Sequence, residues 1–404
     1  MIGKYGMTVG GIALLGALTP CPARPLAIEV GVRAAPAVPV PVAAPLPQAA
    51  APLLPPPTHG VYRANGPQER GFSVQVCRVG PWAEGAQYLA FLLPASWPAG
   101  RQRLEVDLAF VSPDVPGFRF EEAKGKYLRV FEGDRPVLTY NSGMMLAQGV
   151  PEDRGRSCYL HPLYGLDGEV LSGDFEPDHY HHRGVFWAWP RMKAGERGFS
   201  LWDLRGGQQR FEQWLGREAG PVCAVFGVRN GWYVGEERVA VETLWLRTWR
   251  TGQTGRAIDV QLTWEATSGP IEILGQVEKG YGGFNVRFGP RQDTVLTTPE
   301  GPQQDSNLLR FAWADLSARF GGAPETSGAA VLVDVGNPGF PNGWTLRNYG
   351  FLGVAWPGLE PYLLEPGKPL TVRYRLWAHR GDAQAGRVAD AYTAFAHPPA
   401  VTVR

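Results

Sequence analysis

The sequence has little of what marks a metal-thiolate, nucleic-acid-binding or membrane-spanning protein. Its four cysteines include no C-x-x-C pair, which disfavours a thiolate zinc site or a redox motif. With 39 basic and 38 acidic residues, the formal net charge is +1, so we expect no long-range attraction to nucleic acid or anionic lipid. No stretch is apolar enough to cross a bilayer, which takes about 20 consecutive apolar residues. The cysteines are Cys21, Cys77, Cys158 and Cys223; the last three, an odd number, are expected to be buried thiols.

Several catalytic motifs are also missing. The chain has no G-x-S-x-G elbow, no H-E-x-x-H pair and no G-x-G-x-x-G loop between a strand and a helix. These absences disfavour an α/β-hydrolase, a zinc protease of that type and a nicotinamide-dependent enzyme. We therefore expect no cofactor. The balanced charge fits a neutral small molecule or oligosaccharide as the ligand, and no nucleic acid.

The N-terminal part has two segments of unusual composition. Residues 1–20 contain Lys4 and an apolar run over 8–18, which is too short to span a bilayer and is typical of a signal peptide. Residues 21–58 are dominated by proline, alanine and valine, a composition that favours extended polyproline-like backbone. We interpret them as a linker and expect export to the periplasm or the cell exterior, with N-terminal membrane tethering as a variant.

What the sequence has in quantity is the pattern of β-strands. It contains 52 glycines, 37 prolines and 11% aromatic residues but only 19% charged residues, which favours many turns and strands. Runs of period two, for example 239–246 and 257–264, are typical of strands with one buried face. The predicted fold is all-β. A small β region at 60–132 precedes a large antiparallel β-sandwich at 135–404 with few short helices.

Three of the seven histidines fall within four positions, in the segment Asp178-His179-Tyr180-His181-His182-Arg183-Gly184. If this segment is extended, His179, His181 and Arg183 share one face. Paired imidazoles can transfer protons near neutral pH, bind a metal with a third ligand, or hydrogen-bond a polyhydroxylated ligand. We expect Arg183 to lower the histidine pKa values, and Asp174 and Asp178 to orient the rings. The alternative is a solvated strand end.

A second candidate feature is the segment 278–288, which has three glycines within four positions. Glycine lets a ligand approach the backbone closely, and Glu278 and Lys279 place a carboxylate and an amine beside it. Arg287 is suited to hold an oxyanion or a carboxylate. The alternative is a hairpin with a solvated charge pair.

Tryptophan is abundant, with 14 residues. Indole rings stack on the apolar faces of sugars, but most tryptophans of a sandwich belong to its core. Only Trp187 or Trp202, which follow the histidines, is expected near a site.

The segments that carry these features resemble a known family. They are Arg135–Asn141, His161-Pro162-Leu163, Asp178–Gly184, Lys279–Phe284 and Tyr374-Arg375. Together they are similar to the bacterial "PmoA-like" family of unknown function (DUF6807), over roughly residues 135–400. The family is similar in fold to the galactose-mutarotase-like supersandwich, which implies carbohydrate chemistry by analogy. A methane monooxygenase label does not fit, because that subunit has several membrane spans.

Three functions follow as hypotheses. The first is an exported carbohydrate-active enzyme of epimerase, lyase or glycosidase type, with His179, His181 and Glu278 as catalytic acid–base residues. The second is a non-catalytic carbohydrate-binding protein. The third is a metal enzyme with His179 and His181 plus His161 or Glu278 as ligands. The predicted substrate-binding residues are His161, His182, Arg183, Trp187, Lys279, Tyr281 and Arg287.

Overall fold

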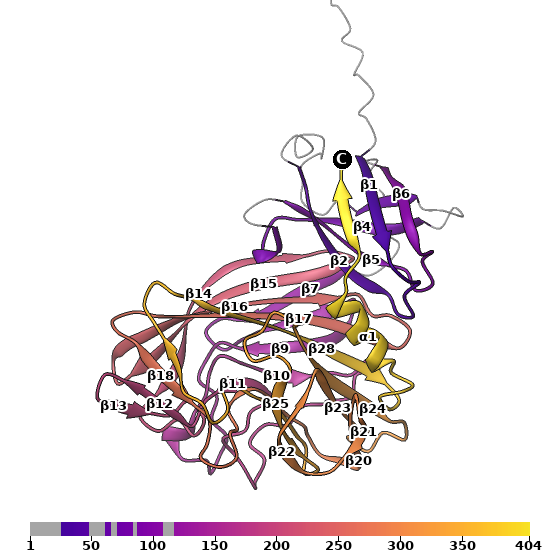
Figure 1. Cartoon of the computed structure of the whole chain (residues 1–404). Helices are drawn as coiled ribbons and strands as arrows, with labels where there is room; N and C mark the ends of the chain where they lie inside the picture. Colours follow the sequence, from indigo (N-terminus) through magenta and orange to yellow (C-terminus); the bar gives the residue numbers. More distant parts are fainter. Residues whose placement is uncertain (1–25, 48–60, 66–70, 84–86, 108–116) are drawn as a thin grey trace, which may run out of the picture.

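The computed structural model describes residues 26–47, 61–65, 71–83, 87–107 and 117–404. The predicted signal segment at 1–20 lies outside them. The described chain consists mainly of strands in four sheets, and neighbouring strands pair antiparallel (Figure 1). Its helices are α1 (Val388–Ala396) and the short 3₁₀ helices η3 (Pro81–Ala83) and η4 (Glu152–Arg154). The prediction of an all-β antiparallel fold is confirmed.

Two nine-stranded sheets form the large sandwich. In spatial order the first contains β22 (Ser306–Phe311), β25 (Asn342–Arg347), β26 (Phe351–Ala355), β19 (Gly283–Arg287), β11 (Val185–Ala188), β10 (Tyr159–Leu163), β9 (Arg135–Asn141), β8 (Tyr127–Glu132) and β7 (Phe118–Ala123). The second contains β14 (Gln208–Ala219), β15 (Cys223–Val234), β16 (Glu237–Trp249), β17 (Gly255–Ala266), β28 (Leu370–Arg380), β24 (Ser327–Val333), β23 (Trp313–Phe320), β20 (Arg291–Thr298) and β21 (Gly301–Gln303). A four-stranded sheet of β13 (Arg197–Phe199), β12 (Arg191–Ala194), β18 (Ile271–Leu274) and β27 (Tyr362–Leu364) packs on the same core.

The two large sheets meet in one hydrophobic core because alternate residues of each strand point inward. In β16, Leu244 and Leu246 are fully buried in this core, whereas Thr243 and Trp245 are only partly covered on the other face. Strand β17 is buried on both faces over most of its length. Its outer side is covered because Ala257 belongs to a second cluster, formed with the N-terminal sheet and α1.

The N-terminal sheet lies against the second sheet, close to β15 and β17 (Figure 1). In spatial order it contains β2 (Val40–Pro45), β5 (Tyr88–Leu93), β4 (Gly71–Cys77), β3 (Val61–Asn65), β6 (Gly100–Asp107), β1 (Leu26–Val32) and the C-terminal strand β29 (Ala400–Val403). Cys77, Tyr88 and Ala90 of this sheet pack with Cys223 and Trp249 of the sandwich. The last residues of the chain therefore close the sheet that the first described residues begin.

The interpretation of residues 21–58 as a linker is wrong for residues 26–47, which form β1 and β2. Leu26, Ile28 and Val30, which alternate along β1, are buried. The prolines at Pro41 and Pro45 are tolerated because β2 is an edge strand. The predicted boundary near residue 132 is also displaced, because β7 pairs with β8 and β8 pairs with β9 in the first large sheet.

A buried carboxylate occupies the middle of the sandwich core. Glu242 of β16 has no exposed surface and accepts five hydrogen bonds at 2.7–3.1 Å. The donors are the indole nitrogens of Trp187, Trp232 and Trp264 and the side-chain amides of Gln209 and Asn230. Since Trp187 lies on β11 of the first sheet, this carboxylate ties the two large sheets together.

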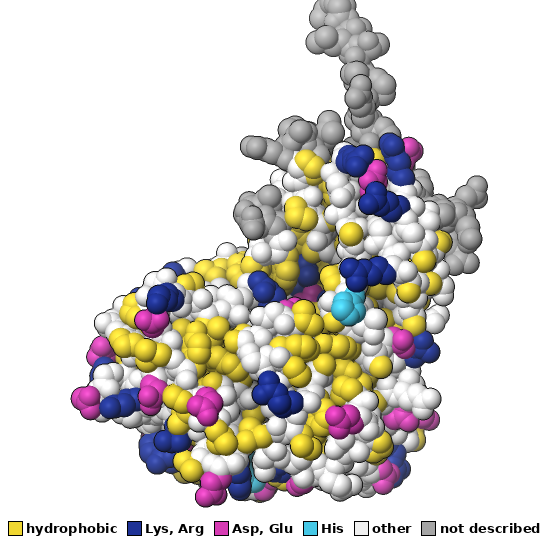
Figure 2. Space-filling view, in the orientation of Figure 1, with side chains coloured by type: hydrophobic (Ala, Val, Ile, Leu, Met, Phe, Trp, Pro, Cys, Tyr) yellow, Lys and Arg dark blue, Asp and Glu magenta, His cyan; other side chains and the backbone are white. Residues whose placement is uncertain are grey.

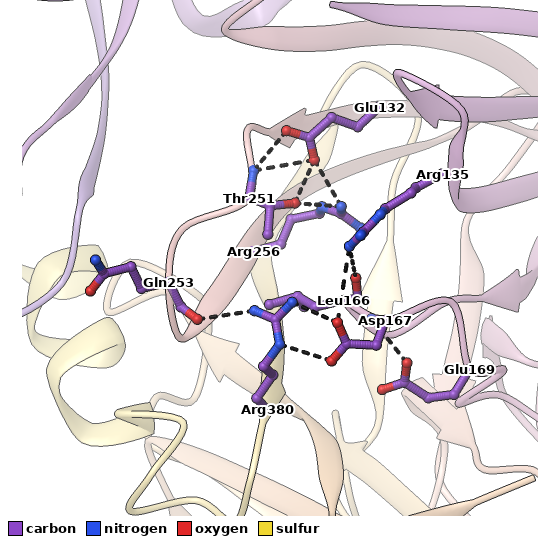
Figure 3. Close-up of polar contacts among 9 residues, drawn as sticks. All are labelled: Glu132, Arg135, Leu166, Asp167, Glu169, Thr251, Gln253, Arg256 and Arg380. Carbon is purple, nitrogen blue, oxygen red and sulfur yellow. Dashed lines mark hydrogen bonds and ion pairs between the residues drawn. The ribbon is translucent and has the colours of Figure 1, made fainter. Parts of the chain in front are cut away.

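Charged side chains join the two large sheets at a second place, near the β8–β9 hairpin (Figure 3). Arg380 of β28 donates two hydrogen bonds to Asp167, at 2.8 and 2.7 Å, and Arg256 of β17 donates one to Glu132 at 2.8 Å. Arg135 donates to the carbonyl oxygen of Leu166 at 3.2 Å. The hydrogen bonds from Arg380 lower the pKa of Asp167. Asp167 and Glu132 each have an arginine partner, so we interpret these ion pairs as structural contacts between the two sheets.

The visible surface carries charges of both signs. Figure 2 shows Lys, Arg, Asp and Glu side chains scattered among hydrophobic ones without a large area of one sign. No helix within the described residues is long and apolar enough to cross a membrane.

Candidate functional site

The histidine cluster lies on the loop that connects β10 to β11, and it forms a turn. The backbone N–H of His179 donates to the carbonyl oxygen of Glu176 at 3.0 Å, and that of His182 donates to His179 at 2.9 Å. These i to i+3 hydrogen bonds are incompatible with an extended strand. The prediction that His179, His181 and Arg183 share one face of a strand is therefore wrong.

The turn nevertheless brings the three imidazoles together. The rings of His179 and His182 are stacked, with centroids 4.7 Å apart and an interplanar angle of 3°. The His181 ring stands edge-on to both, at 5.6 Å from His179 and 4.5 Å from His182. His182 is buried, whereas 38% of the His179 side chain is exposed. The partly exposed ring of His179 is therefore stacked on the buried ring of His182.

Aromatic rings from distant parts of the chain surround the histidines. Tyr349, in the turn between β25 and β26, also stacks with His179, with centroids 5.3 Å apart. Phe351 and Trp202 lie 4.8 and 5.3 Å from His182. Tyr281 packs on Trp202 at 4.7 Å. Of the two tryptophans expected near a site, Trp202 is there.

A carboxylate and a buried arginine orient His179. The Oδ2 atom of Asp178 lies 3.0 Å from Nδ1 of His179, and Arg287 donates a hydrogen bond to the other oxygen at 2.6 Å. Burial acts to raise the pKa of Asp178, but the hydrogen bonds from His179 and Arg287 lower it overall. With Nδ1 held by a carboxylate, Nε2 of His179 is the ring nitrogen left for a ligand.

Two polar groups of the site are buried without a hydrogen-bond partner. They are Nδ1 of His182 and the Nε and Nη1 atoms of Arg287. Such groups cost about 1–3 kcal/mol each when left unsatisfied, so each of them requires a physical explanation. The Arg287 guanidinium also lies over the Tyr349 ring, 4.8 Å from its centroid. Arg287, predicted to contact the ligand, is thus placed beside the histidines.

Two histidines of the cluster, His181 and His182, are held in the neutral form. Burial lowers the pKa of His181 to about 4, with further lowering by His179 and Arg156. Burial also lowers the pKa of His182 well below its usual value, followed by the charges of His181 and His179. The direction agrees with the prediction, but Arg183 is not among the main causes at either residue. Its charge lowers the pKa of His161 instead, after burial.

Acid is expected to destabilise the protein through His181 and His182. Because their folded-state pKa values lie below the unfolded value of about 6.5, the unfolded state binds more protons as the pH falls. Their contribution to the free energy of unfolding is therefore complete above that pH and is lost on approach to about pH 4, the value for His181. Urea unfolding at a series of pH values measures this loss, and the double variant His181→Gln/His182→Gln should show a shallower dependence. Equal slopes for the two proteins would refute the assignment.

Several predicted site residues lie elsewhere. Arg183 is fully buried and donates to the carbonyl oxygens of Tyr180 and Arg154, both at 2.7 Å, so it holds the turn and cannot reach a ligand. Trp187 is fully buried on Glu242 and is no stacking platform. Both assignments are corrected, since the packing of each residue is complete.

Of the remaining predicted site residues, Tyr281 lies at the histidine cluster, whereas His161, Glu278 and Lys279 have no contact with it within the described residues. The Nδ1 atom of His161 lies 2.9 Å from the hydroxyl of Ser172, and no ring contact in the described chain joins it to the cluster. Glu278 and Lys279 are exposed, and no hydrogen bond or ion pair of the described residues connects them with the histidines. Tyr281 joins the site through Trp202. The prediction that Glu278 acts with His179 and His181 in acid–base catalysis is therefore not supported by any contact within the described residues.

Metal binding finds no support in the geometry. Within the described residues, no group of three or more His, Cys, Asp or Glu side chains is arranged to hold a metal ion. The alternative of a centre on His179 and His181 with His161 or Glu278 therefore lacks a ligand set.

Comparison with known proteins places this site within a family. The model of DUF6807, described as a family of unknown function, matches residues 127–393. The chain belongs to the DUF6807 family. The match includes every residue of the histidine site, and no curated protein matches the chain. Among solved structures, the GalM/aldose epimerase homologue from C. elegans is similar, with 8% identity and a TM-score of 0.30 over 65% of this chain and 99% of that one. Similarity at this level supports no conclusion about ligand or reaction.

For this DUF6807 member, sequence reasoning missed Tyr349 and Phe351 entirely. Both lie about 170 residues after the histidines in a strand–turn–strand unit that carries no motif. The only signal available was the Asn348-Tyr349-Gly350 turn, which places an aromatic ring at an exposed tip. Asp178, expected to orient a histidine, does contact one.

Proposed function

We propose that this protein is an exported carbohydrate-active protein whose site is the cluster of His179, His181, His182, Asp178, Arg287 and Tyr349. One observation carries the proposal: a partly exposed imidazole is held by a carboxylate on one nitrogen and stacks with two other rings. This arrangement fixes the ring while leaving an edge for a ligand. Export rests on the pattern of residues 1–20 alone.

The chemistry of the site fits a polyhydroxylated ligand. Sugar sites combine aromatic rings with a few convergent polar groups. Here the rings of Tyr349 and Tyr281 are partly exposed, and the partly exposed imidazoles of His179 and His181 supply donors and acceptors. Neutral His181 can accept a hydrogen bond from a hydroxyl group, while the buried Arg287 holds the Asp178 carboxylate in place behind His179.

For catalysis, His179 is the proton acceptor. Its Nδ1 atom faces Asp178, so Nε2 is free to remove a proton from a hydroxyl or from a carbon next to a carbonyl group. The carboxylate stabilises the imidazolium that forms, and Arg287 holds the carboxylate. An epimerase or lyase needs such a base, and a glycosidase would need a second acid besides it.

A non-catalytic binding protein is the second candidate. It is favoured by the position of Glu278, whose exposed side chain has no hydrogen bond or ion pair with His179 within the described residues. Both candidates predict binding, and only the first predicts a product.

Thermal shift with a panel of mono- and oligosaccharides tests the proposal. A ligand that binds only the folded state raises the melting temperature. At a free ligand concentration of a hundred times Kd, it adds about 2.7 kcal/mol to the free energy of unfolding. We expect at least one saccharide to stabilise the wild-type protein, and Tyr349→Ala to lose most of that shift. The matched control Tyr233→Ala removes a half-buried tyrosine from β15 and should keep it. No shift with any saccharide, or an undiminished shift in Tyr349→Ala, would count against this site. Product analysis of the stabilising saccharide then separates enzyme from binder.

A further inference from the structure

Two buried thiols meet where the N-terminal sheet packs on the sandwich. Cys77 is the last residue of β4, and Cys223 is the first residue of β15. Neither has any exposed surface, and their Sγ atoms lie 3.7 Å apart. Both are free cysteines, as expected from the sequence. They are 146 residues apart in the chain and belong to different sheets.

The side chain of Gln75 holds the two strands together at this point. Its Oε1 atom accepts hydrogen bonds from the backbone N–H groups of Val222 and Cys223, both at 3.0 Å. Its Nε2 atom donates to the carbonyl oxygen of Cys223 at 3.2 Å and to the sulfur of Cys77 at 3.4 Å. Since three of these four bonds reach residues 222 and 223, the backbone beside the two sulfurs is fixed across the junction.

Little movement separates this arrangement from a covalent bond. The S–S distance of a disulfide is about 2.05 Å, so the two sulfurs must approach by about 1.7 Å. Rotation about χ1 moves a cysteine sulfur by this amount without displacing the strand. By contrast, Cys158 lies in the other core cluster, inside the sandwich, and contacts the Ser157 hydroxyl.

We propose that Cys77 and Cys223 form a disulfide that covalently joins the N-terminal sheet to the sandwich when the protein meets a disulfide oxidant. One thiolate attacks a sulfur of the oxidant, for example oxidised glutathione, and forms a mixed disulfide with release of one glutathione thiol. The second cysteine thiolate then attacks the protein sulfur of that mixed disulfide and releases the second glutathione thiol. Two protein thiols are oxidised and one glutathione disulfide is reduced. The inference does not use the histidine site.

Burial decides when the bond can form. It raises the pKa of the Cys223 thiol, and the exchange requires a thiolate that the oxidant can reach. The reaction therefore proceeds while the junction is open, during folding or in a local opening. After closure the bond is shielded from reductants by the same packing.

Counting thiols in the full 404-residue chain tests the inference without any substitution. The protein is kept reduced or is incubated with oxidised glutathione near its melting temperature, cooled, denatured and reacted with a thiol reagent. We expect the number of reactive thiols to fall from four to two, leaving Cys21 and Cys158. Tryptic digestion without reductant should link peptide 71–78 to peptide 218–229, with a mass two hydrogens below their sum.

The stability of the junction provides a second measurement. Closing so long a loop should raise the melting temperature of the oxidised protein by several degrees over the reduced one. Cys158→Ala should show the same gain, whereas Cys77→Ala should show none. Four reactive thiols after oxidation, glutathione adducts without a linked peptide pair, or a link through peptide 157–183 would each overturn the inference.

Discussion

Replacing Glu242 with glutamine is expected to lower the free energy of unfolding by about 2–6 kcal/mol, although the two side chains have nearly the same size. The carboxylate accepts five hydrogen bonds from groups that have no access to water. A glutamine offers one oxygen, and its NH₂ group would face donors. Even with its oxygen in the place of Oε2, which accepts four of the five bonds, the Asn230 amide loses its acceptor and the new NH₂ group faces a donor. Two buried N–H groups are then unsatisfied, at about 1–3 kcal/mol each.

The matched control lies on the same strand. Glu237 of β16 pairs with Arg197 at 2.6 Å, but about half of each side chain is exposed. Glu237→Gln should therefore change the free energy of unfolding by less than about 1 kcal/mol. Urea unfolding of the wild-type protein and both variants measures the difference. If Glu242→Gln proves as stable as the control, the relief from burying a charge outweighs the lost hydrogen bonds, and the carboxylate does not hold the sheets together.

The position of Glu242 also connects stability with the site. Its donor Trp187 lies on β11, five residues after His182, and the chain between them leads directly into the histidine turn. Loss of this anchor should loosen the segment that carries the site. A Glu242→Gln protein that stays folded but loses activity would show that the Glu242–Trp187 hydrogen bond supports the geometry of the histidine turn.

Removal of the His179 ring is expected to reduce turnover of the identified saccharide by about 10²- to 10⁴-fold, the usual contribution of a general acid or base. The fall should be in kcat, because the ring acts on a proton in the transition state. Asp178→Asn should give a smaller loss. It keeps a side chain of the same shape beside Nδ1 but removes the charge that stabilises the imidazolium.

Steady-state kinetics of His179→Ala against the wild type measures this effect. His397→Ala is the control, because it removes an exposed histidine that follows α1, outside the cluster. Its kcat and KM should equal those of the wild type. A His179→Ala protein that folds, binds the saccharide and turns it over at the normal rate would show that the proton acceptor is another residue.

The strand pattern was readable from the sequence because burial in a two-layer sandwich repeats every two residues. The runs at 239–246 and 257–264 lie within β16 and β17 as predicted. The same reasoning failed for residues 26–47. A Pro-rich segment looks like a linker unless it lies at the edge of a sheet, and edge position depends on strand order.

The sequence by itself determined that the chain builds antiparallel sheets, since burial repeats with a local period of two, and it placed three histidines within four positions. A turn of the folded chain, which the sequence pattern did not predict, stacks their rings. Only the tertiary structure decided which side chains accompany them. Tyr349 and Arg287 reach His179 and Asp178 because β26, β19 and β11 are neighbours in one sheet, although they are far apart in the chain. The burial of Trp187 was likewise decided by tertiary structure, because its indole N–H donates a hydrogen bond to Glu242 on the opposite sheet.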